Sequence, residues 1–369
     1  MTRPSPSTGP SHPTQSPGAP LDVLVIGGGQ AGLTMGYHLT RSGSRYQIVD
    51  AGTEIGEAWR LRWDSLRLFT PAQYDNLPEL PFPASPDTYP GKDDVADYLQ
   101  AYAAEFTLPI RLATTVTSLT RSDDVYVAKT GEETVEARQV VIATGPFQTP
   151  YVPSVADRLD SDVHQIHSVD YRRPAAVPPG KILVVGAANS GCQIAAELSA
   201  THSVELSAGQ RIPTIPQRPF GRDVWWWATR LGLDRVTTDS RLGRRLTGRD
   251  QVIGSGPRQL ARKLGVRIRP RVTSAADRTV TFADGAAAEF DAVIWATGFV
   301  ADHSWVDIPE VKDEQGRIQH SRGLTASPGL YLLGMTWQHT RTSALLGWVT
   351  VDAAFLADRI ASVARRYRQ

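Results

Sequence analysis

The stretch that decides the fold is LDVLVIGGGQAGLTMGYHLTRSG, residues 21–43. Its first six residues are mostly apolar and predict a short buried strand, and the apolar periodicity that follows predicts an amphipathic helix. The glycines between them read Gly27-x-Gly29-x-x-Gly32. Gly27 permits a tight turn, Gly29 leaves room for a pyrophosphate, and Gly32 lets the helix approach the strand. The stretch therefore predicts a dinucleotide-binding unit.

The strand that follows strengthens this prediction. It is RYQIVDAG, residues 45–52, and near its end Asp50 is placed to accept hydrogen bonds from a ribose diol. The start of the helix adds unpaired N–H groups and a partial positive charge, which favour phosphates. The residues expected to bind this first dinucleotide are Gly27, Gly29, Gln30, Ala31, Gly32, Asp50 and Ala51.

A second unit of the same kind begins with KILVVGAANSGCQIAAELSA, residues 181–200. Ala188 replaces the middle glycine, and its methyl group narrows the approach of a phosphate without closing it. The next strand ends with Ser207 and Arg211 in place of an acid, which suits a 2′-phosphate, so NADPH is favoured and NADH stays possible. The residues expected at this second site are Gly186, Ala188, Asn189, Ser190, Gly191, Ser207, Arg211, Thr297 and Gly298.

Each unit closes with an apolar strand that runs into Ala-Thr-Gly, VVIATGPF at 140–147 and AVIWATGF at 292–299. The first of these adds three residues to the first site, namely Ala143, Thr144 and Gly145. Two dinucleotide units in one chain imply a hydride path between two cofactors. The first cofactor is then most simply FAD, which accepts a hydride, and the second is NAD(P)H.

These patterns predict an α/β fold with two Rossmann-like dinucleotide-binding domains. We expect an FAD-binding domain formed by residues 21–150 and 289–369. An NAD(P)H-binding domain, residues 151–288, is inserted between its two parts. Residues 1–20 are rich in Pro, Ser, Thr and Gly and predict a disordered tail.

Composition excludes several classes of function. The chain has 369 residues, of which 41% are hydrophobic and 21% charged, as in ordinary soluble globular proteins. Its 39 Lys and Arg balance 38 Asp and Glu, so the whole chain carries no field for nucleic acid or an anionic membrane. The single cysteine, Cys192, excludes an intramolecular disulfide, a CxxC redox pair and a cysteine-based zinc site. No GxSxG or HExxH pattern supports a hydrolase or a metalloenzyme, and no metal is expected.

Residues 212–250 are less regular than the rest of the second unit. Prolines, arginines and the run Trp225-Trp226-Trp227 predict a short helical excursion. We expect these tryptophans to pack against the neighbouring unit, while a substrate mouth and a membrane-facing lid remain alternatives.

Taken together, the motifs resemble the class B flavoprotein monooxygenases, in particular small bacterial flavin-containing monooxygenases and their plant indole-pyruvate monooxygenase relatives. Besides both glycine motifs and both Ala-Thr-Gly strands, GEAWR at 56–60 is similar to the family's GGxW element. The stretch 161–171 is similar to the fingerprint FxGxxxHxxxY. It has Ser161 for Phe and Val163 for Gly, while His167 and Tyr171 keep their places.

The resemblance implies where the flavin and the substrate lie. Trp59, Arg60, Phe69 and Thr70 are expected along the isoalloxazine ring. Trp337, Gln338 and His339 are expected to line the substrate pocket. The flavin itself carries the chemistry in this family, so His167, Tyr171 and Arg60 are only candidates for a catalytic role.

The resemblance also implies an activity, an NAD(P)H-consuming monooxygenase in which a C4a-hydroperoxyflavin oxygenates a small organic substrate. Tyr171 stands where Baeyer–Villiger relatives carry Trp, which favours oxidation of a thioether or amine. Baeyer–Villiger oxidation of ketones, a non-oxygenating FAD/NAD(P)H reductase and a redox-sensing flavoprotein remain open alternatives. We expect a cytoplasmic protein whose partners are a small-molecule substrate and O₂, with no nucleic acid and no membrane. Monomer and homodimer both remain open.

Overall fold

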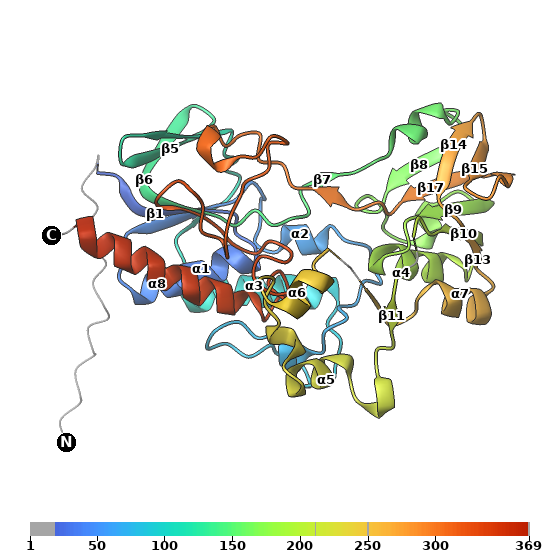
Figure 1. Ribbon diagram of the computed structural model, residues 1–369, viewed down its shortest axis with the longest axis horizontal. Helices are drawn as coiled ribbons and strands as arrows, with labels where there is room; N and C mark the ends of the chain where they lie inside the picture. Colours follow the sequence, from blue (N-terminus) through green and yellow to red (C-terminus); the bar gives the residue numbers. More distant parts are fainter. Residues whose placement is uncertain (1–18, 211, 249–250, 368–369) are drawn as a thin grey trace, which may run out of the picture.

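The computed structural model describes residues 19–210, 212–248 and 251–367, and within them the chain builds two main sheets that lie side by side (Figure 1). Of the expected tail, residues 1–20, only residues 19 and 20 are among the described residues. Each sheet centres on one of the two glycine motifs.

The first sheet has seven strands in the order β3-β2-β1-β6-β5-β4, with β19 also paired to β6. Strands β3, β2, β1, β6 and β19 run parallel, and β4 and β5 form an antiparallel edge. Its strands are β1 (Leu21–Ile26), β2 (Tyr46–Val49), β3 (Ile110–Arg111), β4 (Ser118–Ser122), β5 (Val125–Thr130), β6 (Glu133–Ile142) and β19 (Leu330–Leu332).

Central strand β1 is buried on both faces, as expected for a parallel sheet. Val23 and Val25 join the core beneath the helices, whereas Leu24 and Ile26 join the core on the opposite face. The helices on the first face are α1 (Gln30–Arg41), α3 (Lys92–Glu105) and α8 (Val349–Tyr367). Two shorter helical segments precede α3, namely α2 (Glu57–Arg60) and η1 (Ala72–Tyr74).

The second sheet has five parallel strands in the order β13-β10-β9-β17-β8. They are β8 (His164–His167), β9 (Lys181–Val185), β10 (Ser203–Ser207), β13 (Arg267–Arg269) and β17 (Ala292–Trp295). Helices α4 (Asn189–Leu198) and α7 (Pro257–Leu264) pack on the face that carries Ile182 and Val184. A small sheet packs on the other face through Phe282 and Phe290, and its strands are β14 (Val272–Ala276), β15 (Thr279–Phe282) and β16 (Ala287–Glu289).

The expected domain boundary at residue 289 differs from the observed one, because it precedes strand β17. This strand pairs with both β9 and β8 and therefore lies inside the second sheet. The chain returns to the first unit only after Trp295.

Two antiparallel strands cross between the units, β7 (Thr149–Pro150) on the way out and β18 (Phe299–Val300) on the way back. In Figure 1, β7 lies in the gap between the two sheets. Three short 3₁₀ segments complete the connections, η2 (Ser154–Arg158), η3 (Pro174–Ala176) and η6 (Pro309–Val311).

The predicted excursion is confirmed where the structure describes it. Leaving the second sheet after β10, it contains β11 (Thr214–Ile215), η4 (Pro219–Gly221), α5 (Val224–Arg230), η5 (Leu233–Arg235), α6 (Arg241–Leu246) and β12 (Val252–Ile253). It packs against the first unit, as expected, because Trp225 and Gln217 both donate hydrogen bonds to the carbonyl oxygen of Phe69. None of the helices in the described ranges combines the length and apolarity needed to cross a bilayer.

Candidate cofactor and substrate site

The first glycine loop is closely packed on its inner side and open on its outer side. Gly27 has a φ of 113°, which favours glycine, and an added Cβ there would meet the carbonyl oxygen of Ala143 at 2.5 Å. At Gly32, an added Cβ would lie 1.8 Å from the carbonyl oxygen of Gly27. At Gly29, by contrast, an added Cβ would meet nothing within 4 Å. The described chain leaves that side of the loop free for a bound group.

The start of α1 suits an anionic group. Gly29 is the N-cap residue, no side chain caps the helix, and no acid lies in its first turn. Its free N–H groups and partial positive charge therefore face the open side of the loop. Beside them, the carboxylate of Asp50 accepts hydrogen bonds from the N–H groups of Gly28 and Gly52. Each carboxylate oxygen keeps lone pairs for ribose hydroxyls, so the residues present fit a dinucleotide such as FAD.

The other residues expected at this site have different surroundings. Gln30 donates to the carbonyl oxygen of Ala344 at 3.1 Å and accepts from the indole N–H of Trp59 at 3.3 Å. Trp59 packs against the cores of both units. Ala31 is buried and Ala51 is exposed. Gln30 thus links the start of α1 to two distant segments.

The second glycine loop repeats this geometry. An added Cβ at Gly186 would lie 2.2 Å from the carbonyl oxygen of Ala296, and one at Gly191 would lie 1.8 Å from that of Gly186. Ala188, the N-cap of α4, has φ −77° and ψ −172°, against −78° and −172° at Gly29. The exchange of glycine for alanine therefore leaves the loop backbone unchanged.

The start of α4 is also free of a protein cap, and no acid lies in its first turn. Asn189 accepts a hydrogen bond from the N–H of Ile253 at 3.0 Å, so strand β12 of the excursion rests beside the helix start. Ser190 is half-buried next to it. These residues fit a second dinucleotide such as NAD(P)H.

The residues after β10, which are expected to bind the 2′-phosphate of NADPH, are not all placed as the sequence predicts. Ser207 is buried, and its hydroxyl donates to the carbonyl oxygen of Pro270 at 2.8 Å, so the structure does not bring it to the loop surface. Arg211 lies outside the described residues. Arg271, missed in the sequence, is exposed and runs past Gly209, where an added Cβ would lie 3.7 Å from its Cγ. Its signal was its place just after a third parallel strand, β13.

Residues after β6 form a compact turn. The N–H of Ala143 donates to the carbonyl oxygen of Ile26, which keeps the turn beside the first glycine loop. The side-chain amide of Gln148 donates to the hydroxyl of Thr144 and the carbonyl oxygen of Gly145, both at 2.7 Å. Thr144 and Gly145 therefore lie at the carboxyl edge of the first sheet, beside the first glycine loop.

The corresponding turn after β17 is tied to His167. Thr297 donates to the carbonyl oxygen of Tyr151, and the N–H of Tyr151 donates to that of Gly298. His167 accepts from the N–H of Val169 through Nδ1, at 3.2 Å, and its Nε2 lies 3.0 Å from the carbonyl oxygen of Gly298. This pattern requires a neutral ring with its proton on Nε2. Burial lowers the pKa of His167, which agrees with the neutral form.

The two other catalytic candidates also have protein partners. Tyr171 is buried and donates to Glu197 at 2.8 Å, and burial, with this carboxylate, raises the pKa of Tyr171. Arg60 forms ion pairs with Glu54 at 3.2 Å and Asp97 at 2.7 Å. The side chains of His167, Tyr171 and Arg60 therefore each have a different protein partner, and a catalytic role for any of them stays a prediction.

The residues expected to line the substrate pocket lie in a loop that is held by its own hydrogen bonds and by one to the excursion. Gln338 is buried and donates to the carbonyl oxygen of Leu332 at 3.0 Å. The carbonyl oxygen of His339 accepts from the N–H of Thr238 in the excursion at 2.8 Å. Trp337 has a φ of 56°, unusual for a bulky residue. The side chain of Gln338 thus stabilises the loop itself, and the backbone of His339 contacts the excursion of the second unit.

Four aromatic side chains form a continuous row at this contact, and we call them the aromatic row. Phe69 stacks on Trp225 with ring centres 6.0 Å apart. Trp225 lies 5.1 Å from Trp348, which stacks on Tyr74 at 5.6 Å. The row therefore joins the loop expected at the flavin, the excursion and the last loop before α8.

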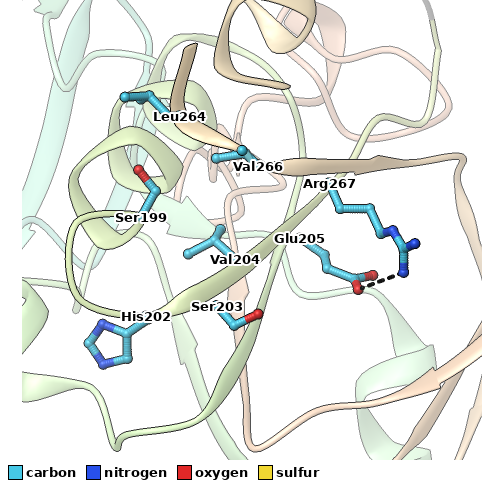
Figure 2. Close-up of a pocket in the computed structure, with 9 residues that line it drawn as sticks. Ser199, His202, Ser203, Val204, Glu205, Leu264, Val266 and Arg267 are labelled. Carbon is cyan, nitrogen blue, oxygen red and sulfur yellow. Dashed lines mark ion pairs between the residues drawn. The ribbon is translucent and has the colours of Figure 1, made fainter. Parts of the chain in front are cut away.

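Of two hollows in the described part of the chain, one is lined by residues of the aromatic row and the other is not. The one in Figure 2, about 250 Å³, lies at Ser203 and Arg267, where β10 and β13 begin, the opposite end from the glycine loops. There Glu205 is surrounded by cations; burial alone would raise its pKa, but hydrogen bonds from Arg269 and Lys181 hold the pKa below its usual value. The other hollow, about 230 Å³, lies beside Tyr74 and Trp348 at the end of the aromatic row.

A buried carboxyl group lies next to the expected flavin contacts. Thr70 donates to Asp75 Oδ1 at 2.6 Å, while Asp75 Oδ2 is buried without a partner among the described residues. Burial raises the pKa of Asp75 to about 7, although the bond from Thr70 opposes the rise. Asp75 was missed in the sequence, where its one signal is its place in the loop after Phe69 and Thr70.

Gly29→Ala tests the open side of the first loop. Because an added Cβ meets no described atom within 4 Å, we expect little change in the thermal midpoint of the flavin-free protein. The methyl group takes up phosphate space, so we expect the Kd for FAD, measured by flavin fluorescence quenching, to rise about tenfold. Gly32→Ala is the contrast, since its Cβ strikes backbone and the variant should fail to fold. Unchanged FAD affinity in Gly29→Ala would contradict the assignment.

Asp75→Asn tests the buried carboxyl group. A folded pKa of about 7 means that the native state binds this proton more tightly than the unfolded chain, so the carboxyl group costs stability as pH rises toward and through 7. We expect Asp75→Asn to gain about 2 kcal/mol relative to wild type between about pH 5.5 and about pH 8.5. Thermal midpoints across that range measure the gain. Exposed Asp87→Asn is the control, and a difference independent of pH would refute the expectation.

Comparison with known proteins agrees with this geometry. The family model of the pyridine nucleotide-disulphide oxidoreductases matches residues 24–213. The chain is 43% identical to an uncharacterized CzcO-like oxidoreductase of Geobacillus kaustophilus, over 92% of this chain and 98% of the relative. It is 27% identical to the indole-3-pyruvate monooxygenase YUCCA8 of Oryza sativa subsp. indica, over 85% of this chain and 86% of that protein.

Among solved structures, a flavin-containing monooxygenase from Stenotrophomonas maltophilia is 31% identical, with a TM-score of 0.78. The match covers 93% of this chain and 99% of that one. The predicted fold class and family are thus confirmed. The chain is an oxidoreductase of the class B flavin monooxygenase family, and this membership implies FAD and NAD(P)H as its cofactors.

Proposed function

We propose that the protein is an FAD-dependent, NAD(P)H-consuming monooxygenase that places one oxygen atom of O₂ on the heteroatom of a small thioether or amine. The observation that carries the proposal is the repeated glycine loop, whose two copies share one backbone geometry and both lead into helices without a protein cap. Two dinucleotide sites suit a transfer of hydride from one cofactor to the other.

The fate of the electrons separates this proposal from a disulfide reductase. The chain has one cysteine, Cys192, which is buried and whose thiol pKa burial raises to about 12. A buried, protonated thiol without a second cysteine cannot pass electrons to a disulfide substrate. Electrons from NAD(P)H must therefore leave from the flavin, and dioxygen is the acceptor that the family membership supports.

We assign FAD to the first unit and NAD(P)H to the second. In the first unit, the N–H groups that begin α1 would hold the diphosphate and Asp50 would hold the ribose. The start of α4, with Asn189 and Ser190, would hold the second cofactor. Bound FAD supplies a hydride acceptor for NAD(P)H and, once reduced, a ring that activates dioxygen.

The chain's own contribution is position and the exclusion of water. The carbonyl oxygen of Phe69, expected at the flavin, accepts hydrogen bonds from Trp225 and Gln217, so the excursion is fixed over this loop. The aromatic row offers an apolar wall that suits a thioether or amine with an organic group. Preference for a heteroatom over a ketone rests on Tyr171, at the position where Baeyer–Villiger relatives carry Trp.

Incorporation of labelled oxygen tests the proposed reaction. The purified protein with FAD and NADPH is supplied with ¹⁸O₂ and, in parallel, an aryl methyl thioether or a cyclic ketone. We expect one labelled atom in the sulfoxide, the other in water, and one NADPH consumed per product. A labelled lactone with no sulfoxide would replace heteroatom oxidation by Baeyer–Villiger oxidation. NADPH consumption that yields only hydrogen peroxide with both substrates would refute the monooxygenase proposal.

Arg271→Ala tests the preference for NADPH. If its guanidinium pairs with the 2′-phosphate, its loss should raise the Kd for NADP⁺ about tenfold and leave the Kd for NAD⁺ unchanged. Titration of the oxidised protein by calorimetry measures both constants. Exposed Arg262→Ala, in the same unit, is the control. A loss seen in Arg211→Ala instead would return the role to Arg211, as the sequence predicts, and equal effects on both nucleotides would remove Arg271 from it.

A further inference from the structure

The outer side of the excursion carries apolar side chains that nothing in the described part of the chain covers. We call residues 218–235 the tip. Phe220 is 94% exposed, Leu231 65% and Leu233 50%. In Figure 1, α5 lies at the lower edge of the molecule, away from both sheets. The tip thus presents apolar surface at an extremity of the fold.

These apolar side chains belong to one surface. The rings of Phe220 and Trp227 meet edge to face at 6.2 Å, and the indole N–H of Trp227 donates to the carbonyl oxygen of Pro219. Leu231 follows Trp227 by four residues, so the two share a face of the helical turn. Phe220, Trp227 and Leu231 therefore form a continuous strip.

The charge around this strip is positive. Arg218, Arg222, Arg230 and Arg235 are all exposed, and none forms an ion pair with a carboxylate among the described residues. The guanidinium of Arg222 lies over the ring of Trp226, 5.5 Å from its centre. The whole chain carries a net charge of only +1, so this is a local concentration of charge.

The two acids of the tip face inward. Asp223 accepts from the N–H of Trp225 through one oxygen, and from Tyr89 and Gln217 through the other. Asp234 accepts from the indole N–H of Trp348, and its second oxygen is buried. Asp223 and Asp87 lie close enough to act on Arg218, whereas no carboxylate of the described residues forms an ion pair with Arg222, Arg230 or Arg235.

The tip is also held firmly. Trp225, on the inner side of α5, is buried against Phe69 and Trp348. The same short helix therefore has one side fixed to the first unit and the other side free. A partner that meets the free side meets an ordered surface.

We propose that the tip docks on the surface of a bilayer that contains anionic phospholipid. Aromatic side chains settle at the level of the lipid headgroups, and arginines beside them attract anionic headgroups. The strip is too short for insertion across a bilayer, so the contact is peripheral. It would bring the aromatic row near a phase in which lipophilic substrates dissolve. The proposal replaces the expectation of no membrane partner, and it does not depend on the proposed reaction.

Vesicle co-sedimentation tests the docking. The full chain, loaded with FAD, is mixed with vesicles of phosphatidylcholine alone or with added phosphatidylglycerol. We expect binding that needs the anionic lipid, weakens with salt and shifts tryptophan emission to the blue. Absence of binding at low salt, or equal binding to both kinds of vesicle, would overturn the proposal. Salt-sensitive binding to a polyanion such as heparin without binding to vesicles would also overturn it.

Variants locate the contact. Phe220→Asp and Leu231→Asp should each reduce the partition coefficient at least about fivefold, and Arg222→Ala and Arg230→Ala about fivefold each. Leu264→Asp is the matched control, because Leu264 is an exposed leucine of α7 that lines the hollow at Ser203 and Arg267 (Figure 2), and its replacement should leave binding unchanged. All variants should keep their FAD content and thermal midpoints. Undiminished binding in the four tip variants, or an equal loss in Leu264→Asp, would refute the tip as the docking surface.

Discussion

Two contacts in which a helix meets a strand with no side chain between them determine the rest of this structure. Gly32 lies against the backbone of Gly27, and Gly191 against that of Gly186, so closely that a Cβ at either helix position would fall 1.8 Å from a carbonyl oxygen. The contact fixes where each helix begins relative to its sheet. Since the first N–H groups of a helix are its anion-binding groups, the contact also fixes where a diphosphate can sit.

The sequence predicted the features that such local constraints impose. A turn with positive φ followed by a close approach admits glycine almost alone, so the glycine loops, their strands and the start of both helices could be located from the pattern. The helical excursion was predicted from its break in pattern. In each case the residues that impose the structure lie within a few positions of the sequence pattern that predicts it.

What the sequence did not predict depends on partners far along the chain. The hydroxyl of Ser207 is taken by the carbonyl oxygen of Pro270, sixty-three residues away. The expected boundary at residue 289 put strand β17 with the returning first unit, whereas its pairing with β9 and β8 places it in the second sheet. Side-chain direction and strand pairing are settled by tertiary contacts, which a single sequence does not display.

The excursion explains how two units joined by narrow crossovers can keep one relative position. Hydride transfer requires the two reacting rings to be held within about 3–3.5 Å of each other, so loose units would rarely react. The crossovers β7 and β18 supply one attachment, strengthened by His167 on Gly298. The excursion supplies a second on the other side of the site, through Phe69, His339 and Trp348. Two separated attachments resist rotation that one would permit, and the excursion therefore belongs to the site although it contributes no residue to either glycine loop.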